Sequence, residues 1–145
     1  MKSMAHKLFL DTNIIIDYIQ ERQFEFQAIK EIMYLGEIKK IELYISESVI
    51  TTSFYHLQKQ KIDALAVLRE LCKTVNTIPF SKDTLYDPLE KYKDIEDGLL
   101  YFSAVKNKMN FFVTRNVKDF VFLSPSLPVL SPTNFIKEIY LNDIS

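Results

Sequence analysis

The stretch KLFLDTNIIID, residues 7–17, places an acidic residue between two apolar segments. Residues 7–10 have the composition of a short buried strand, and an isoleucine run begins at Ile14. A lone carboxylate at Asp11 is costly to bury without a partner. Two interpretations remain open: Asp11, Thr12 or Asn13 caps a helix that begins at Ile14, or Asp11 forms one wall of a metal site. Acidic residues at equivalent places further along the chain would favour the metal site.

Short apolar segments typical of strands alternate with helical patterns along the chain. Strands are expected at 7–10, 42–45, 74–78, 111–114 and 127–130. Helices are expected near 14–20, 24–38, 49–60, 62–73, 82–91, 95–108 and 134–140. Alternation of this kind predicts a three-layer α/β/α fold, with a short-stranded central parallel sheet covered by helices on both faces.

Composition limits the class of protein. With 145 residues, of which 48% are hydrophobic and 26% charged, residues 1–145 are expected to form a single domain. Apolar stretches are far shorter than the ~20 residues of a membrane span, and no signal-type apolar region follows the N-terminus, so we expect a cytoplasmic protein. One cysteine, Cys72, and two histidines exclude a disulfide and a typical zinc site; Cys72 is expected in the core.

Acidic residues recur where the predicted strands end. Asp11 directly follows the first strand, Asp94 and Asp97 stand three apart at the start of a late helix, and Asp119 lies in the turn after the next strand. Each has an ordinary explanation, because aspartate caps helices and favours turns. However, ligands of open parallel sheets bind at the carboxyl ends of the strands. Because all of these acidic residues are expected at this edge of the sheet, they favour a common site.

Electrostatics restricts what such a site can hold. Two carboxylates ~4 Å apart repel by about 4 kcal/mol at an effective dielectric constant of 20, so three remain ionised together only around a cation. Hard oxygen ligands without histidine or cysteine select Mg²⁺ or Mn²⁺. Such an ion suits phosphodiester hydrolysis, because it activates water and neutralises charge on the transition state.

Three motifs in this order resemble the PIN domain family: LDTN at 10–13, DIED at 94–97 and TRNVKDF at 114–120. The resemblance covers residues 7 to about 135, and the third motif is its most specific part. It implies a compact Mg²⁺- or Mn²⁺-dependent endoribonuclease. It also implies the toxin half of a toxin–antitoxin pair, with an antitoxin protein as partner, and a homodimer.

Carried over residue by residue, the resemblance implies catalysis and metal binding by Asp11, Asp97 and Asp119, with Asp94 as an auxiliary metal ligand. It further implies polar residues that help to order water or metal, at Asn13, Thr114 and Asn116. Two basic side chains near the same edge are expected to meet RNA phosphates, Arg115 and Lys118. The formal net charge of −1 leaves room only for such a local basic patch.

One acid of the family pattern is missing. The helix after the second strand carries it in the family, and here the equivalent position is Thr52 or its neighbour, whereas Glu47 comes about one turn too early. Either the nuclease works with its remaining acids, helped by Asp94 or by the hydroxyls of Thr51 and Thr52, or the domain has become a binding module without catalysis. A haloacid-dehalogenase-type phosphatase fits less well, because it needs a second aspartate where this chain has Asn13.

Overall fold

The computed structural model describes residues 5–22, 25–120 and 127–144, and these contain one sheet of five parallel strands. The strands are β1 (Lys7–Leu10), β2 (Glu42–Ser46), β3 (Val75–Ile78), β4 (Phe111–Val113) and β5 (Val129–Leu130). Their order across the sheet is β3-β2-β1-β4-β5. The predicted central parallel sheet is therefore confirmed.

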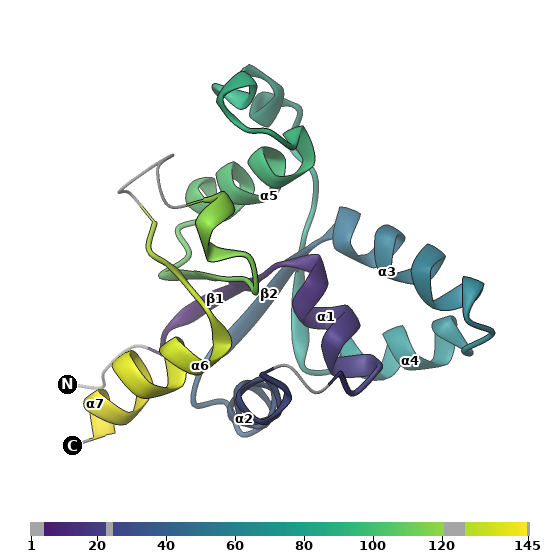
Figure 1. Ribbon diagram of the computed structural model, residues 1–145, viewed down its shortest axis with the longest axis vertical. Helices are drawn as coiled ribbons and strands as arrows, with labels where there is room; N and C mark the ends of the chain where they lie inside the picture. Colours follow the sequence, from purple (N-terminus) through teal and green to yellow (C-terminus); the bar gives the residue numbers. More distant parts are fainter. Residues whose placement is uncertain (1–4, 23–24, 121–126, 145) are drawn as a thin grey trace.

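Helices cover this sheet on both faces. The longer ones are α1 (Thr12–Ile19), α2 (Phe26–Glu37), α3 (Glu47–Lys59), α4 (Ala64–Leu71) and α5 (Ile95–Lys106). The chain closes with α6 (Pro132–Asn134), a π-helical turn (Phe135–Tyr140) and α7 (Leu141–Ile144). In Figure 1, α1, α3 and α4 lie on one side of β1 and β2, and α5 lies on the other. This arrangement is the predicted three-layer α/β/α fold.

The core forms around β1 and β4, whose side chains are almost all apolar. Leu8, Phe9 and Leu10 of β1 are fully buried, as expected for a strand with helices on both faces. Phe9 stacks on Phe112 of β4, with ring centroids 5.4 Å apart, and Phe112 lies 4.7 Å from Phe120. These contacts pack β1 against β4 close to the carboxyl ends of the strands, where Asp11 lies.

Several predicted elements differ from the structure. The helix expected at 82–91 is wrong: the chain forms two 3₁₀ turns, η1 (Lys82–Tyr86) and η2 (Leu89–Lys91), on either side of Pro88. Proline lacks the N–H that a continuous helix needs, and it disfavours helical backbone at the preceding residue. The helix expected from residue 24 begins at Phe26 in the described chain, and residues 23–24 lie outside it.

Two smaller predictions also fail. Cys72 is exposed at the carboxyl end of α4, so its assignment to the core is wrong. The strand expected at 127–130 is reduced to its last two residues, since Pro128 has no N–H for a ladder. Among the described helices, none is long and apolar enough to cross a membrane.

The strand order places a reversal point at the centre of the sheet. From β1 the chain first moves outward through β2 to β3, then returns through α5 to β4 on the other side of β1. β1 and β4 are therefore neighbours whose following loops diverge, with Leu10 beside Val113. Ligand sites of open parallel sheets form at the carboxyl ends of such a strand pair.

Candidate active site

Asp11 lies at this reversal point and is 5% exposed. Its Oδ1 accepts a hydrogen bond of 2.8 Å from the backbone N–H of Thr12, as expected of a helix N-cap. Its Oδ2 accepts 2.8 Å and 3.1 Å bonds from the Thr114 hydroxyl and the Asn13 amide. Asp11 therefore caps α1, as one interpretation proposed, and three donors also fix its carboxylate at the strand ends.

The turn after β4 is built around Thr114, which is fully buried. Its Oγ1 donates to Asp11 and accepts from the backbone N–H of Asn116 at 3.0 Å. The Asn13 Oδ1 atom accepts from the backbone N–H of Arg115 at 3.3 Å. The expected polar residues Asn13 and Thr114 thus join the loops after β1 and β4 and orient Asp11 between them.

The start of α5 brings the next acids to this edge. Asp94 is the N-cap of α5, and its Oδ1 accepts from the backbone N–H of Glu96 at 2.9 Å. Asp97 lies in the first turn and is only partly exposed. Asp94, Glu96, Asp97 and Asp11 line one cleft of about 300 Å³, whose other polar lining includes Arg115 and Asn116. We call it the first cleft.

A second cleft adjoins the first. It has a volume of about 390 Å³ and shares Asp94 and Asp97 with the first cleft. Its remaining lining residues are Tyr92, Lys93, Lys118 and Asp119. Asp119 ends the 3₁₀ turn η3 (Val117–Asp119), so the third expected acid lines the second cleft rather than the first. Asp94 and Asp97 stand at the boundary between the two clefts.

Burial and the repulsion between acids raise the pKa of Asp97 well above its ordinary value. The pKa of Asp97 is raised to about 7, first by burial and then by repulsion from four neighbouring carboxylates. These are, in decreasing order of effect, Asp11, Asp94, Asp119 and Glu96. Burial also raises the pKa of Asp11, although its hydrogen bonds from Thr114, Thr12 and Asn13 oppose the rise. All four of the other acids in the two clefts therefore act electrostatically on Asp97.

The donor set is chemically suited to a hard divalent cation. All of these side chains offer carboxylate oxygens, which Mg²⁺ and Mn²⁺ prefer, and a cation would relieve the repulsion that raises the Asp97 pKa. Within the described residues, however, no three histidine, cysteine, aspartate or glutamate side chains are already grouped closely enough to hold an ion. The acids share two connected clefts without forming a preassembled cage.

A buried ion pair beside the first cleft was missed from the sequence. Asp17 of α1 is 1% exposed, and both its carboxylate oxygens lie 2.9 Å from Nη1 of Arg115. Arg22 approaches the same carboxylate at 3.5 Å. Burial raises the pKa of Asp17, and the two arginines oppose this rise. Asp17 therefore holds two arginines of the first cleft in place.

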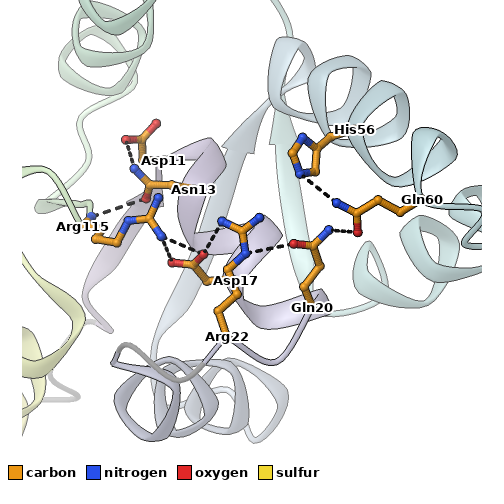
Figure 2. A network of polar contacts seen from close by, with 8 residues as sticks. All are labelled: Asp11, Asn13, Asp17, Gln20, Arg22, His56, Gln60 and Arg115. Atoms are coloured by element: carbon orange, nitrogen blue, oxygen red, sulfur yellow. Dashed lines mark hydrogen bonds and ion pairs between the residues drawn. The ribbon is translucent and has the colours of Figure 1, made fainter.

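Figure 2 shows how this pair continues as a chain of polar contacts. Nε of Arg22 donates to Gln20 at 2.9 Å, Gln20 bonds to Gln60, and Gln60 contacts Nε2 of His56 at 3.5 Å. His56 belongs to α3 and lines the first cleft. The network links the turn after β4, through α1 and the residues that follow it, to α3.

Helix α3 contributes no carboxylate to the first cleft. Thr52, at the position of the missing family acid, lies exposed on α3 and is not among the lining residues, whereas His56 one turn later is. Glu47 lies at the start of α3, where its Oε1 accepts from the backbone N–H of Phe80 at 3.4 Å. The acids of the two clefts therefore come from the loops after β1 and β4 and from the start of α5.

A parallel three-layer fold with acids at its reversal point defines the class to which this chain belongs. A model of the PIN domain matches residues 7–118, and the chain belongs to this family. It is 31% identical over 138 residues to Ribonuclease VapC1 of Aquifex aeolicus (strain VF5), a match that covers 90% of this chain and 94% of the relative.

Two solved structures share the fold at lower sequence identity. One is VapBC2 from Rickettsia felis bound to a DNA fragment from its promoter, with a TM-score of 0.67 and 22% identity over 85% of this chain and 96% of that one. The other is a toxin–antitoxin complex from Klebsiella pneumoniae, with a TM-score of 0.66 and 24% identity over 86% of this chain and 97% of that one. At this level of identity they support the fold.

Proposed function

We propose that this protein is a Mg²⁺- or Mn²⁺-dependent endoribonuclease that hydrolyses RNA phosphodiester bonds. The carboxyl group of Asp97 carries this proposal, because burial and the repulsion of four other acids together raise its pKa to about 7. A divalent cation is the ligand that such a cluster favours. The relative named as a ribonuclease supports RNA as the substrate.

In this proposal Asp11, Asp97 and Asp119 are the catalytic acids and metal ligands, and Asp94 is an additional ligand. A bound ion would supply an activated water and neutralise charge on the phosphate. The chain's own contribution is orientation: Thr114 and Asn13 hold Asp11, and the first turn of α5 presents Asp97. Asn116 lines the first cleft and is available to order water there.

Basic residues flank the acids in both clefts and are proposed to bind RNA phosphates. Arg115 lines the first cleft, fixed by Asp17, and Lys118 lines the second. An arginine whose geometry is already fixed loses less conformational entropy when it binds a phosphate. RNA that crosses the boundary formed by Asp94 and Asp97 would therefore contact cations on both sides.

We further propose that the protein is the toxin of a toxin–antitoxin pair. Two relatives of the same fold were solved as complexes of the VapBC or toxin–antitoxin kind. This chain has a cleft of about 310 Å³ formed by α1, α2 and α4, with apolar lining residues Tyr18, Ile19, Met33, Val67 and Leu71 and the acids Glu37 and Glu70. An amphipathic, basic segment of an antitoxin fits this chemistry. A homodimer is also part of the proposal.

No acid of α3 lines the first cleft, and this favours a second candidate, a PIN-fold binding module without catalysis. Thr52 is exposed and His56 takes its place along the first cleft. Such a module would retain the fold and would gain little stability from divalent ions. Metal-dependent stabilisation that Asp97→Asn weakens therefore separates the two candidates.

Cleavage of a mixed RNA pool by the purified protein tests the proposal directly. We expect cutting with Mg²⁺ or Mn²⁺, none with EDTA, and at least a hundredfold loss in both Asp11→Asn and Asp97→Asn. Asp63→Asn is the matched control, because Asp63 caps α4 away from both clefts by accepting from the backbone N–H of Ala66. Asparagine caps nearly as well as aspartate, so this variant should cut normally.

The Asp11→Asn result also decides between the two interpretations of that residue. If Asp11 were only a cap, asparagine would preserve both fold and cleavage. Retained cutting would therefore remove it from the catalytic set. Cutting that persists in EDTA would contradict metal dependence, and the absence of cutting by folded protein under all conditions would favour the binding module.

A further inference from the structure

Arg22 lines the first cleft and is placed there by the turn that ends α1. Glu21 adopts the left-handed conformation, with a φ of 52°. Its N–H bonds to the carbonyl of Tyr18 at 3.3 Å, and the N–H of Arg22 bonds to the carbonyl of Asp17 at 3.0 Å. These two bonds form a Schellman motif, which turns the chain back over the last turn of a helix. The motif therefore brings Arg22 beside Asp17.

The side chain of Arg22 is held together with that of Arg115. Asp17 is 1% exposed, and its carboxylate lies 2.9 Å from Nη1 of Arg115 and 3.5 Å from Nη1 of Arg22. Gln20 accepts a further bond of 2.9 Å from Nε of Arg22 and is itself bonded to Gln60 at the end of α3. Two guanidinium groups are thus fixed around one buried anion.

Each guanidinium group keeps a donor that these contacts do not use. Within the described residues, the bonds and ion pairs of the two side chains involve Nη1 of both arginines and Nε of Arg22, and leave Nη2 of each without a partner. In Figure 2 both Nη2 atoms point away from Asp17, toward the side of the view on which Asp11 and His56 lie. Asp11 and His56 line the same cleft, and both arginine side chains are partly exposed.

The two arginines also carry more charge than their anion neutralises. They share the single carboxylate of Asp17, so one positive charge remains in excess. Glu25, the other acid that acts on Asp17, accepts a bond from the backbone N–H of Thr133 at 2.9 Å. In the part of the chain that the structure describes, neither arginine forms an ion pair with an acid that lines the first cleft. Fixed guanidinium groups with unused N–H donors and excess charge are suited to phosphate oxygens.

We propose that Arg22 and Arg115 together bind a phosphate group of the RNA backbone, adjacent to the phosphate that is cleaved. This inference rests on the proposed function, because RNA is the ligand, and it assigns Arg22 to RNA binding. The first cleft also contains Asp11 and Asp97, the proposed metal ligands. One strand of RNA in this cleft would therefore meet both the metal ion and the arginine pair.

The arginine pair supplies attraction that a metal ion alone would not. Four carboxylates line the first cleft, from Asp11, Asp94, Glu96 and Asp97. A single divalent ion offsets two of these negative charges, so the remaining charge would still repel a phosphodiester. Two guanidinium groups beside the ion reverse this balance where the RNA backbone enters. Because both groups are already held by Asp17, they lose less conformational entropy on binding than free side chains.

The test compares Arg22→Gln with Arg22→Lys and with Arg69→Gln. Arg69 is the matched control, because it is an exposed arginine of α4 that lines neither of the two clefts. Binding of a fluorescein-labelled, mixed-sequence single-stranded RNA is measured by fluorescence anisotropy over a series of KCl concentrations. Ca²⁺ takes the place of Mg²⁺ or Mn²⁺ in these titrations. Cleavage with Mn²⁺ and thermal unfolding without RNA are recorded separately.

We expect Arg22→Gln to bind the RNA about tenfold more weakly, the scale of a hydrogen bond to a charged group. The slope of log affinity against log salt should fall by about 0.7, the contribution of one phosphate contact on a single strand. Arg22→Lys keeps the charge, so it should retain the slope and lose less affinity. Arg69→Gln should match wild type in both. The melting temperature of Arg22→Gln should stay close to that of wild type, because Asp17 retains Arg115.

The outcomes separate this contact from the proposed nuclease activity. Equal RNA affinity of Arg22→Gln and wild type would overturn the contact, as would weaker binding with an unchanged salt slope or an equal loss in Arg69→Gln. A melting temperature of Arg22→Gln lowered as far as that of Asp17→Asn would also overturn it, since Arg22 would then serve the fold. Failure of wild type to bind RNA would overturn it in favour of another anion, such as an acidic side chain of a partner protein. If wild type binds RNA without cutting it and Arg22→Gln binds more weakly with the smaller slope, the contact stands and the nuclease proposal fails.

Discussion

Both oxygens of the Asp17 carboxylate lie 2.9 Å from Nη1 of Arg115, although the two residues are 98 positions apart in the chain. Asp17 is almost fully buried on α1, whereas the side chains of Arg115 and Arg22 remain 30% and 40% exposed. The buried anion thus ties the turn after β4 to α1 and draws both cations to the first cleft. The ion pair therefore both stabilises the fold and positions side chains of the site.

Replacing Asp17 with asparagine should weaken the fold. The variant leaves two arginines without their shared anion, but both can turn toward water, so the loss should stay below the 3–5 kcal/mol typical of a broken buried pair, at about 2 kcal/mol. Urea unfolding measures it. The control is Lys73→Gln, which breaks the exposed pair with Glu70 and should change stability by less than about 0.5 kcal/mol. Equal effects of both variants would contradict a structural role for Asp17.

Replacing Thr114 with valine should affect both stability and cleavage. The change keeps the shape of a fully buried residue but removes the donor to Asp11 and the acceptor of the Asn116 N–H. We expect a loss of about 1–3 kcal/mol and at least tenfold slower RNA cleavage, because Asp11 loses its shortest side-chain donor. Thr77→Val, at an exposed position of β3, is the control and should leave cleavage unchanged. Normal cleavage by Thr114→Val would show that Asp11 needs no such support.

The sequence predicted the meeting of Asp11 and Thr114 because each directly follows a short apolar strand, and parallel strands end at one edge. It could not show that β1 and β4 are neighbours, since strand order depends on long-range packing. It also missed the pairing of Asp17 with Arg115. Asp17 reads as a surface residue of a helix, and its pairing with Arg115 joins residues 98 positions apart in the chain.

The region before α5 was mispredicted for a related reason. Apolar residues between 82 and 91 have a helical spacing, yet Pro88 divides the segment into two 3₁₀ turns. The resulting path brings Tyr92 onto Gly98, a contact that no local pattern encodes. The second cleft therefore became visible only in the structure, whereas its acids were already visible in the sequence.

Gly98→Ala should destabilise the protein although alanine is the better helix former. The added Cβ would lie 2.9 Å and 3.0 Å from side-chain atoms of Tyr92 and Leu89. Overpacking typically costs 1–3 kcal/mol, which exceeds the gain of about 1 kcal/mol in helix propensity. We expect a net loss of about 1 kcal/mol in urea unfolding. Ser103→Ala, also on α5, is the control without a predicted clash; a stabilised Gly98→Ala would refute the tight contact.

The raised pKa of Asp97 predicts how stability and metal binding depend on pH. Because the folded-state pKa is about 7 and the ordinary value 3.8, the folded state holds this proton more tightly, and the resulting stabilisation is complete below about pH 4 and lost as the pH rises through 7. At pH 8 without metal, Asp97→Asn should therefore be more stable than wild type by about 1 kcal/mol, a modest figure because solvent screens a partly exposed group. At pH 6 the difference in stability should shrink.

Mn²⁺ competes with the proton on Asp97, so it should raise the wild-type melting temperature more at pH 8 than at pH 6. It should have little effect on Asp97→Asn. An equal Mn²⁺ effect on both proteins would exclude Asp97 as a ligand.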